Sequence, residues 1–176
     1  CLPERGRIGI FNRSYYEETL VVRVHPPILS GQHLPKELVT KSIWEERLED
    51  IAGFERYFAR QGHLILKFFL HVSKEEQKAR FLARLDEPKK NWKFALGDVR
   101  ERAHWDEYQM AYEKTIRATA APHAPWFVVP ADHKWFTRLV VSQTLVAAIE
   151  GLDLAWPKPA LAPADLAAAR KALAKD

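Results

Sequence analysis

Four polar side chains near the start of the chain could together bind phosphate and a metal ion. They follow a short apolar run at residues 8–11 and are Asn12, Arg13, Ser14 and Glu17. In an open parallel α/β sheet, ligands bind beyond the carboxyl ends of the strands. An Arg guanidinium forks onto phosphate oxygens, while a carboxylate or amide holds the water shell of Mg²⁺. The pattern therefore indicates a phosphate and Mg²⁺ site, although many α/β loops begin with polar residues for no such reason.

Polar residues also follow two other segments that we expect to be strands. Residues 63–72 form a near-continuous apolar run that ends at Ser73, and residues 126–129 precede Asp132 and Lys134. A run of this kind is typical of a parallel strand buried on both faces. The carboxyl ends of parallel strands meet at one edge, so these side chains should converge on the first turn. Helix capping alone would also explain Asp132, and Lys134 could belong to a solvated helix face.

A basic region at residues 78–102 joins two segments that carry helix-capping signatures. Ser73 and Glu76 have the spacing of a capping box, and Asp98 and Glu101 repeat it. In most proteins such a region is a solvated face. Its helix–loop–helix form also fits a lid whose cations stabilise a transferred phosphoryl group. The cations of this region are Lys78, Arg80, Arg84, Lys89, Lys90, Lys93, Arg100 and Arg102.

The expected strands alternate with expected helices, which predicts an α/β/α layered domain with a parallel sheet. Three strands, at residues 8–11, 63–72 and 126–129, would make a thin sheet, so we expect its N-terminal part to be missing from this chain. Residues 26–35 hold three prolines and a glycine and are expected to form a loop. The expected helices span residues 15–25, 36–60, 73–85, 98–119 and 132–150, with a possible loose helix in the Ala-rich tail at 159–176.

Composition narrows the possible functions only slightly. The single cysteine excludes an internal disulfide, and the seven histidines have no metal-ligand spacing. No apolar run approaches the roughly 20 residues that span a bilayer, and no signal peptide is visible, which predicts a cytoplasmic protein without a membrane partner. A net charge of +4 permits a polyanionic partner such as nucleic acid, nucleotide or inorganic phosphate, without choosing among them.

Several long motifs, found here in order, resemble the second family of polyphosphate kinases. The resemblance covers about residues 5–158. Its motifs are Phe-Asn-Arg-Ser-Tyr-Tyr-Glu-Glu at 11–18, Leu-Val-Val-Arg-Val-His-Pro at 20–26, Leu-Lys-Phe-Phe-Leu-His-Val-Ser-Lys-Glu-Glu-Gln at 66–77, Asn-Trp-Lys-Phe at 91–94 and Ala-Pro-His-Ala-Pro-Trp-Phe-Val-Val-Pro-Ala-Asp-His-Lys-Trp-Phe at 121–136.

The resemblance implies a P-loop kinase fold akin to thymidylate kinase, with a helical lid. It also implies Mg²⁺-dependent transfer of a terminal phosphate from inorganic polyphosphate to a nucleotide. Residues 12–14 resemble the family's Walker B-type motif, with Asn12 where many members have Asp. That exchange, with Glu17 nearby, is similar to the branch that accepts nucleoside mono- and diphosphates, and Glu17 would then hold Mg²⁺.

The resemblance also assigns roles in the lid. Arg80 matches a lid-side arginine that contacts phosphate, and we expect Arg13 and Arg80 to stabilise charge on the transferred group. Lys89, Lys90 and Lys93 fall in the lid loop, where a polyanion would lie. We expect further substrate contacts from Asn12, Ser14, Arg84, Asp132 and Lys134.

The family's Walker A motif has no counterpart in these 176 residues. The backbone of such a loop cradles phosphates and its lysine neutralises them. We therefore expect residues 1–158 to be the C-terminal part of a P-loop kinase-like domain, with the lid at about 80–102, and to be inactive alone. The resemblance also suggests a homo-oligomer, either a dimer or a tetramer.

Two other functions stay open on the sequence. A nucleoside monophosphate kinase that uses ATP as donor would share the fold. A non-catalytic module that binds polyphosphate or nucleic acid would explain the absent Walker A motif directly. RNA binding is not expected, because Trp92 and Phe94 lack the sheet-borne pattern of an RNA-recognition domain. We expect these two aromatics to pin the lid to the body instead.

Overall fold

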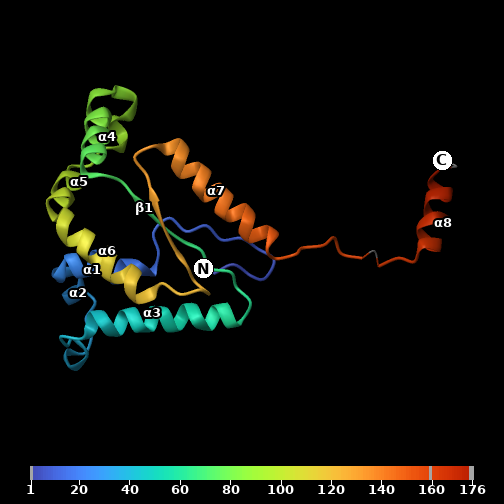
Figure 1. Ribbon diagram of the computed structural model, residues 1–176, viewed down its shortest axis with the longest axis horizontal. Coiled ribbons are helices and arrows are strands. Elements are labelled where there is room, and N and C mark those ends of the chain that lie inside the picture. The colour runs from blue at the N-terminus through green and yellow to red at the C-terminus, as the bar shows by residue number, and fades with distance from the viewer. Residues whose placement is uncertain (1, 159, 175–176) are drawn as a thin grey trace. The chain divides into compact units, whose positions relative to one another are not determined.

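The computed structural model describes residues 2–158 and 160–174 (Figure 1). It divides within α7 into two compact units, one ending at Thr137 and the other starting at Arg138. In chain order the described elements are η1 (Tyr15–Glu18), α1 (Val21–Val24), α2 (Pro26–Gly31), η2 (Lys36–Leu38), α3 (Ile43–Arg60), β1 (Lys67–His71), α4 (Lys74–Asp86), η3 (Pro88–Lys93), α5 (Leu96–Glu101), η4 (Arg102–His104), α6 (Trp105–Thr119), β2 (Trp126–Pro130), α7 (Lys134–Glu150) and α8 (Pro163–Leu173).

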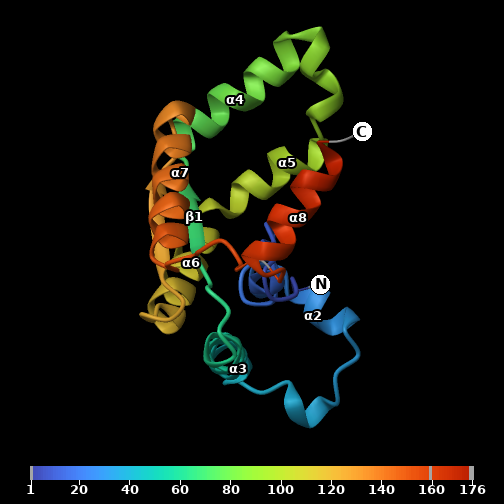
Figure 2. The same cartoon turned by 90° about the vertical axis from the view of Figure 1, so that its right-hand side faces the viewer.

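The first unit is built around a parallel pair of strands. β1 and β2 pair from Lys67 opposite Trp126 to His71 opposite Pro130. Parallel neighbours need a long crossover, and the segment from α4 to α6 supplies it. Figures 1 and 2 show α4 leading away from the carboxyl end of β1. The predicted α/β class and parallel pairing are confirmed.

The prediction of a third strand at residues 8–11 is wrong. This segment has no regular secondary structure, and Ile8 and Ile10 are 75% and 86% exposed. A strand needs a neighbour for its backbone N–H and C=O groups, whereas the sheet of the described chain consists of β1 and β2 alone. Burial of the second expected strand on both faces is also wrong, because Leu70 in β1 is 48% exposed.

Local capping rules succeed at some helices and fail at others. The hydroxyl of Ser73 accepts a hydrogen bond from the Glu76 N–H at 3.1 Å, as predicted for the start of α4. Asp98, in contrast, lies in the first turn of α5, which begins after Ala95. The expected helix at 98–119 is therefore divided among α5, η4 and α6.

The other differences concern boundaries and the loop predicted at residues 26–35. That segment contains helix α2, because a proline is tolerated in the first helical turn, where its N–H would be unpaired anyway. The expected helix at 36–60 is regular only from Ile43, where α3 begins. α7 ends just before Gly151, and α8 confirms the helix in the tail. Residues 159 and 175–176 of that tail lie outside the described part.

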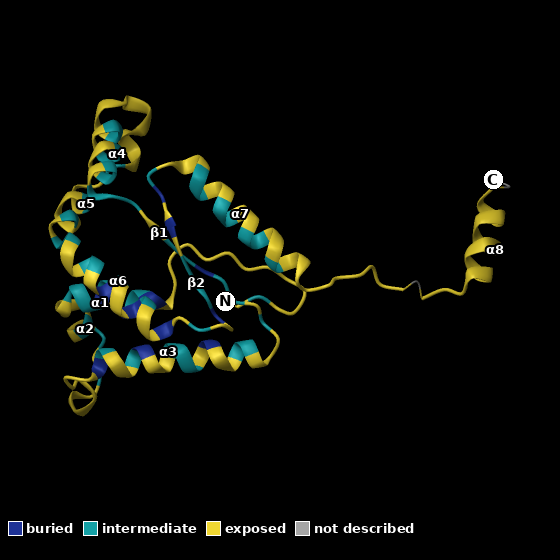
Figure 3. Ribbon diagram, viewed as in Figure 1, coloured by how far each residue is buried: buried dark blue, intermediate teal, exposed yellow. Residues whose placement is uncertain are grey.

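The core of the first unit gathers side chains from η1, from the residue that caps α1 and from α6. Tyr16, Leu20 and Ala111 are buried, with Ile51 of α3 and Trp126 of β2 packed against them. Figure 3 shows the buried positions concentrated in these elements, whereas α4 is mostly exposed or half-buried. The segment that carries Arg13 and Glu17 is therefore attached directly to the core.

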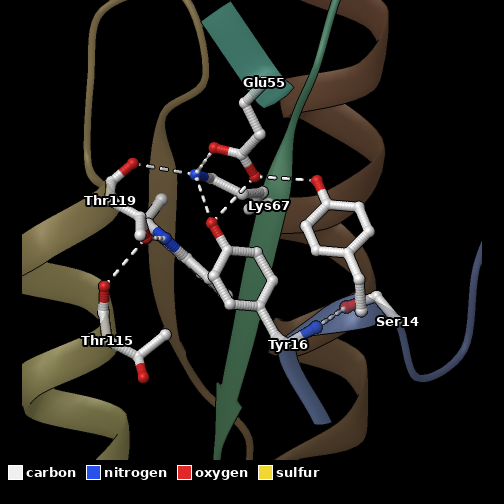
Figure 4. Close-up of polar contacts among 8 residues, drawn as sticks. Ser14, Tyr16, Glu55, Lys67, Thr115 and Thr119 are labelled. Carbon is white, nitrogen blue, oxygen red and sulfur yellow. Dashed lines mark hydrogen bonds and ion pairs between the residues drawn. The ribbon is translucent and has the colours of Figure 1, made fainter. Parts of the chain in front are cut away.

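An ion pair lies inside this core. Lys67 of β1 and Glu55 of α3 are 7% and 1% exposed, and the Lys67 Nζ lies 2.5 Å from the Glu55 Oε2 (Figure 4). The Lys67 ammonium also donates to the Tyr16 hydroxyl at 3.0 Å and to the Thr119 carbonyl at 2.9 Å. All three ammonium protons therefore have acceptors.

The second oxygen of Glu55 is equally well satisfied. Its Oε1 accepts hydrogen bonds from the hydroxyls of Tyr15 and Tyr16, both at 2.8 Å. Burial raises the pKa of both phenols, and the adjacent carboxylate raises it further. Burial lowers the pKa of Lys67, while Glu55 opposes that change. A buried pair is tolerated when its remaining polar groups are satisfied in this way.

No described helix is both long and apolar enough to cross a membrane.

Substitution of Lys67 by Met should destabilise the protein strongly. It leaves the Glu55 carboxylate buried without its cation, which typically costs about 3–5 kcal/mol of unfolding free energy. Urea denaturation of the whole protein would measure this loss. The matched control is Arg117→Met, which breaks an ion pair with Glu113 whose side chains are 77% and 63% exposed. Exposed pairs contribute at most about 1 kcal/mol, so equal losses in the two variants would contradict the prediction.

Candidate functional site

The first part of the site is a strained turn at Arg13. Its φ is 72°, in the left-handed region that residues other than glycine seldom adopt. Such backbone conformations cost about 1–3 kcal/mol and concentrate at functional sites. Ser14 follows as the N-cap of η1, and its hydroxyl accepts from the Tyr16 N–H at 3.4 Å. The turn thus leads straight into the buried network.

The side chain of Arg13 forms a two-pronged ion pair with Glu17. Its Nε lies 2.7 Å from Oε1 and its Nη2 lies 2.5 Å from Oε2. The Arg13 side chain is 70% exposed, so it stays accessible to solvent. Glu17 raises the pKa of Arg13 above its ordinary value, mainly through this hydrogen bond, and Arg13 therefore stays charged. The ion pair with Glu17 therefore holds the charged guanidinium of Arg13 in a fixed orientation.

The donor set for Mg²⁺ around this turn is small. Both Glu17 oxygens contact Arg13, and Asn12 is exposed next to them. Among the residues that the structure describes, no three His, Cys, Asp or Glu side chains converge on a metal position. Mg²⁺ commonly keeps several waters and binds through one or two carboxylates and the substrate's phosphates. The residues present fit that mode of binding and not an all-protein cage.

The second part of the site lies at the carboxyl ends of β1 and β2. The Ser73 N–H donates to the Asp132 Oδ1 at 2.7 Å. Arg80 of α4 donates from Nη2 to the carbonyls of Ala131 and Asp132, at 2.7 and 3.0 Å. These bonds join the two strand ends and hold the base of α4 against them.

The hydrogen bond between Ser73 and Asp132 changes two expectations. In a complete capping box, the Ser73 N–H would donate to the Glu76 carboxylate. Here it donates to Asp132, and the Glu76 carboxylate accepts a hydrogen bond from the Arg80 Nε at 2.8 Å. The capping box is therefore only half formed. The bond from Ser73 lowers the pKa of Asp132, which stays ionised. Capping alone does not account for Asp132, because its carboxylate links the two strands.

The segment from α4 to α5 carries the predicted lid cations. Lys90 pairs with Glu87 at 2.5 Å, and Arg84 lies 3.5 Å from Asp98. The Lys93 Nζ lies 5.0 Å from the centre of the Trp92 ring, and Lys89 is exposed. The loop is closed by Asn91, whose amide donates to the Arg84 and Leu85 carbonyls at 2.7 and 2.8 Å. Three lysines thus lie on one short exposed turn.

The expectation that Trp92 and Phe94 pin the lid to the body is wrong. Trp92 is 79% exposed. Phe94 meets Phe81 of α4 edge to face at 6.4 Å, so it joins the two arms of the same segment. The contact lies within residues 80–102 and not between that segment and the core.

The structure therefore gathers the predicted residues into separate groups. One group is Arg13 with Glu17, and a second is Ser73, Arg80 and Asp132. Among the described contacts, no hydrogen bond joins the two groups. Lys134 is exposed at the start of α7.

A cleft lined by aromatic side chains was not predicted from the sequence. It measures about 330 Å³ and is bordered by β1, α4, α5 and α6. Tyr112 stacks on Phe69 at 4.3 Å, and the Tyr108 hydroxyl donates to Glu101 at 2.8 Å. Burial raises the pKa of both tyrosines, and the hydrogen bond to Glu101 raises that of Tyr108 further. Tyr108 and Tyr112, four residues apart on one helix, were the signal available in the sequence.

Comparison with known proteins identifies the family. The sequence profile of polyphosphate kinase 2 (PPK2) matches residues 1–155. The chain belongs to the polyphosphate kinase 2 family. The structure agrees, since a polyphosphate kinase 2 crystal structure from Arthrobacter aurescens superposes with a TM-score of 0.87 at 40% identity. That superposition covers 99% of this chain and 57% of the other.

Two relatives have names that specify a reaction. An ADP-polyphosphate phosphotransferase from Rhodopseudomonas palustris is 52% identical over 89% of this chain and 55% of its own length. An AMP/ADP-polyphosphate phosphotransferase from Meiothermus ruber is 47% identical over 90% of this chain and 55% of its own length. The chain thus spans about half the length of these members of the polyphosphate kinase 2 family.

Asp132→Asn should lower the melting temperature at neutral pH, because an amide oxygen accepts the Ser73 N–H less strongly than a carboxylate. The folded-state pKa of Asp132 is lowered. Its contribution is therefore complete above the ordinary aspartate pKa, about 4, and is lost as pH falls through the folded-state value.

Melting curves of the whole protein from neutral to acidic pH would show the gap between wild type and variant narrowing. Asp50→Asn, at an exposed position of α3, is the matched control and should show no such pH-dependent gap. A gap for Asp132→Asn that is constant with pH would contradict the role of its charge.

Proposed function

We propose that the whole protein transfers the terminal phosphate of inorganic polyphosphate to ADP or AMP. The observation that carries this proposal is the Arg13 turn, a strained backbone that displays a charged fork and is anchored in a buried ion-pair network. Two relatives named for polyphosphate phosphotransfer, each about 50% identical to this chain, support the choice of donor and acceptor.

The reaction needs no covalent intermediate on the protein. An oxygen of the nucleotide's terminal phosphate attacks the end phosphorus of polyphosphate and forms a new P–O bond. The P–O bond to the rest of the chain breaks, and the shortened polyphosphate leaves with the bonding electrons. Such transfers depend on positioning and on electrostatic stabilisation. Arg13 supplies the stabilising charge, because its guanidinium can form two parallel hydrogen bonds with phosphate oxygens.

Arg80 has a different role in this proposal. Three of its hydrogen bonds go to protein groups, which are the carbonyls of Ala131 and Asp132 and the carboxylate of Glu76. It therefore holds the base of α4 at the strand ends and presents its remaining donors towards the substrate. Arg84, Lys89, Lys90 and Lys93 then lie along the segment that tracks the polyphosphate chain.

Mg²⁺ fits this site as a companion of the substrate. When bound, it would neutralise charge on the phosphate oxygens, with Glu17 as its carboxylate and Asn12 and Ser14 near its water shell. Glu17 orients the Arg13 fork before substrate binds. An exposed ion pair contributes at most about 1 kcal/mol, so incoming phosphate can compete for the guanidinium at small cost.

The finer features of the resemblance belong to the same proposal. They are a three-layer P-loop kinase-like domain akin to thymidylate kinase that includes residues 1–158, a lid at about 80–102 and assembly as a dimer or tetramer. The inactivity of these 176 residues alone, and a cytoplasmic location, stay predictions.

Arg13→Ala should reduce kcat/KM for phosphate transfer at least 100-fold while leaving the melting temperature nearly unchanged. Loss of one charge-stabilising donor typically costs that much in rate, and the 70%-exposed side chain contributes little to packing. The measurement is ATP formation from ADP, Mg²⁺ and long-chain polyphosphate by the whole protein. The control is Arg117→Ala, which removes an arginine of similar exposure that also pairs with a glutamate four residues away.

Unchanged turnover in Arg13→Ala would contradict the proposal that Arg13 stabilises charge on the transferred group. ATP replacing polyphosphate as the preferred donor would instead favour a nucleoside monophosphate kinase. Tight polyphosphate binding without turnover from either donor would favour a non-catalytic binding module.

Replacing Lys89, Lys90 and Lys93 together by Gln should raise the KM for polyphosphate about tenfold and weaken its salt dependence. Three exposed charges, each contributing a fraction of a kcal/mol, account for that size. The KM for ADP should stay near its wild-type value, because the nucleotide carries far less charge. A triple Gln variant of Lys36, Lys41 and Lys114, all exposed elsewhere, controls for net charge. A similar rise in both variants would mean that the turn has no specific role.

A further inference from the structure

His25 lies in one of the sequence motifs, yet no step of the proposed reaction uses it. It is the C-cap of α1 and the N-cap of α2. A proline restricts the backbone of the residue before it, and Pro26 follows His25 directly. On the other side, Val22 of α1 is buried. The backbone that carries the His25 side chain is therefore well fixed on both sides.

The imidazole of His25 contacts the end of α5. Its Nε2 lies 2.8 Å from Oε2 of Glu101, the last residue of that helix. The Tyr108 hydroxyl of α6 donates to the same oxygen at 2.8 Å. The bond from His25, followed by that from Tyr108, lowers the pKa of Glu101, which therefore stays ionised. An ionised carboxylate only accepts, so the imidazole nitrogen is the donor.

Residues 74–104, which we call the α4–η4 segment, form a braced hairpin. Figure 2 shows the chain running outwards along α4 and returning through α5. Three sets of contacts join these two arms, two of them polar and one aromatic. They are the contacts of Arg102 with Lys74 and Gln77, of Arg84 with Asp98, and of Phe81 with Phe94. Because its arms are joined to each other, the segment should move as one body.

Apolar packing does not fix the direction of this segment. None of residues 74–104, all of which the structure describes, is buried. The direction therefore depends on polar contacts at the base, where Arg80 ties the α4 arm to the carbonyls of Ala131 and Asp132. Among the hydrogen bonds of the described residues, only the one from His25 ties the α5 arm to the part of the chain before β1.

We propose that His25 is a positioning residue for phosphate transfer, whose hydrogen bond to Glu101 sets the direction in which the α4–η4 segment presents its three lysines to polyphosphate. The proposal rests on the phosphotransfer function. His25 itself touches no substrate and acts through Glu101. Without this bond the segment adopts several directions, and the apparent affinity for polyphosphate falls by the fraction of molecules in the productive one.

Steady-state kinetics of the whole protein test this role. His25→Ala should raise the KM for long-chain polyphosphate about tenfold, the size expected for loss of a hydrogen bond to a charged group. The kcat should change less than about twofold, because saturating polyphosphate selects the productive direction. His25→Gln, whose amide nitrogen can take the place of Nε2, should restore most of the loss. His123→Ala, at an exposed position, is the matched control and should leave the KM unchanged.

A double-mutant cycle distinguishes positioning of the lysines from a general structural effect. In the background of Lys89→Gln, Lys90→Gln and Lys93→Gln, the further change His25→Ala should raise the KM for polyphosphate by less than about twofold, since no lysines remain to be directed. A second rise of about tenfold in that background would overturn the proposal.

Hydrogen exchange tests the contact without any catalysis. In His25→Ala the amides of residues 96–104 should exchange about fivefold faster than in the wild type, whereas those of α3 keep their rates. Unchanged exchange at residues 96–104 would overturn the proposal. Should His25→Ala melt at a much lower temperature, Glu101→Ala, which removes the acceptor of the same bond, replaces it with the same expected changes.

The positioning role and the phosphotransfer function fail in different ways. Transfer by the wild type, with an unchanged polyphosphate KM in His25→Ala, would overturn the positioning role alone. If the wild type transfers no phosphate from polyphosphate, the phosphotransfer function is refuted, and titration with long-chain polyphosphate measures its affinity in place of the KM. Weaker binding by His25→Ala, restored in His25→Gln, would then still support the positioning role, and equal binding would overturn it.

Discussion

The ion pair between Lys67 and Glu55 is the constraint on which the first unit of this structure depends. Two charges removed from water must satisfy every donor and acceptor they carry, because an unmatched one would cost several kcal/mol. Their partners come from the Tyr15–Tyr16 segment and from Thr119 at the end of α6. Thr119 in turn accepts from the Trp126 indole at 2.9 Å. One network thus determines how η1, α3, α6 and both strands meet, which apolar packing alone would specify less sharply.

This network also explains how an exposed arginine can be held in a strained turn. Arg13 is only two residues from Tyr15, whose hydroxyl is bound to Glu55. Since the residues after the turn cannot move without breaking buried hydrogen bonds, the backbone at Arg13 keeps its left-handed conformation. The Arg13–Glu17 contact, being exposed, can still exchange for another anion. Rigidity in the backbone and exchangeability in the side chain are what a phosphate-binding group requires.

Local signals predicted the elements whose determinants are close in sequence. β1, the Ser73 cap of α4 and the end of α7 at Gly151 follow from apolar periodicity and capping rules. The errors involve partners far apart in sequence. Residues 8–11 have the composition of a strand without a described neighbour, and Asp132 binds an N–H fifty-nine residues away. The buried pair had an unused signal, because Lys67 interrupts an apolar run and Glu55 follows Ile51 by one helical turn.

The positions of the charged side chains carry more functional information than the net charge of the chain. A net charge of +4 is compatible with any polyanion, whereas the structure sorts its charges by place. Acidic side chains line the aromatic cleft, the Arg13 guanidinium is exposed beside Glu17, and three lysines lie on the exposed turn between α4 and α5. Carboxylates repel a chain of phosphates, whereas lysines and an exposed guanidinium attract one. The placement of the charges, and not their sum, therefore limits where on this chain a polyanion can bind.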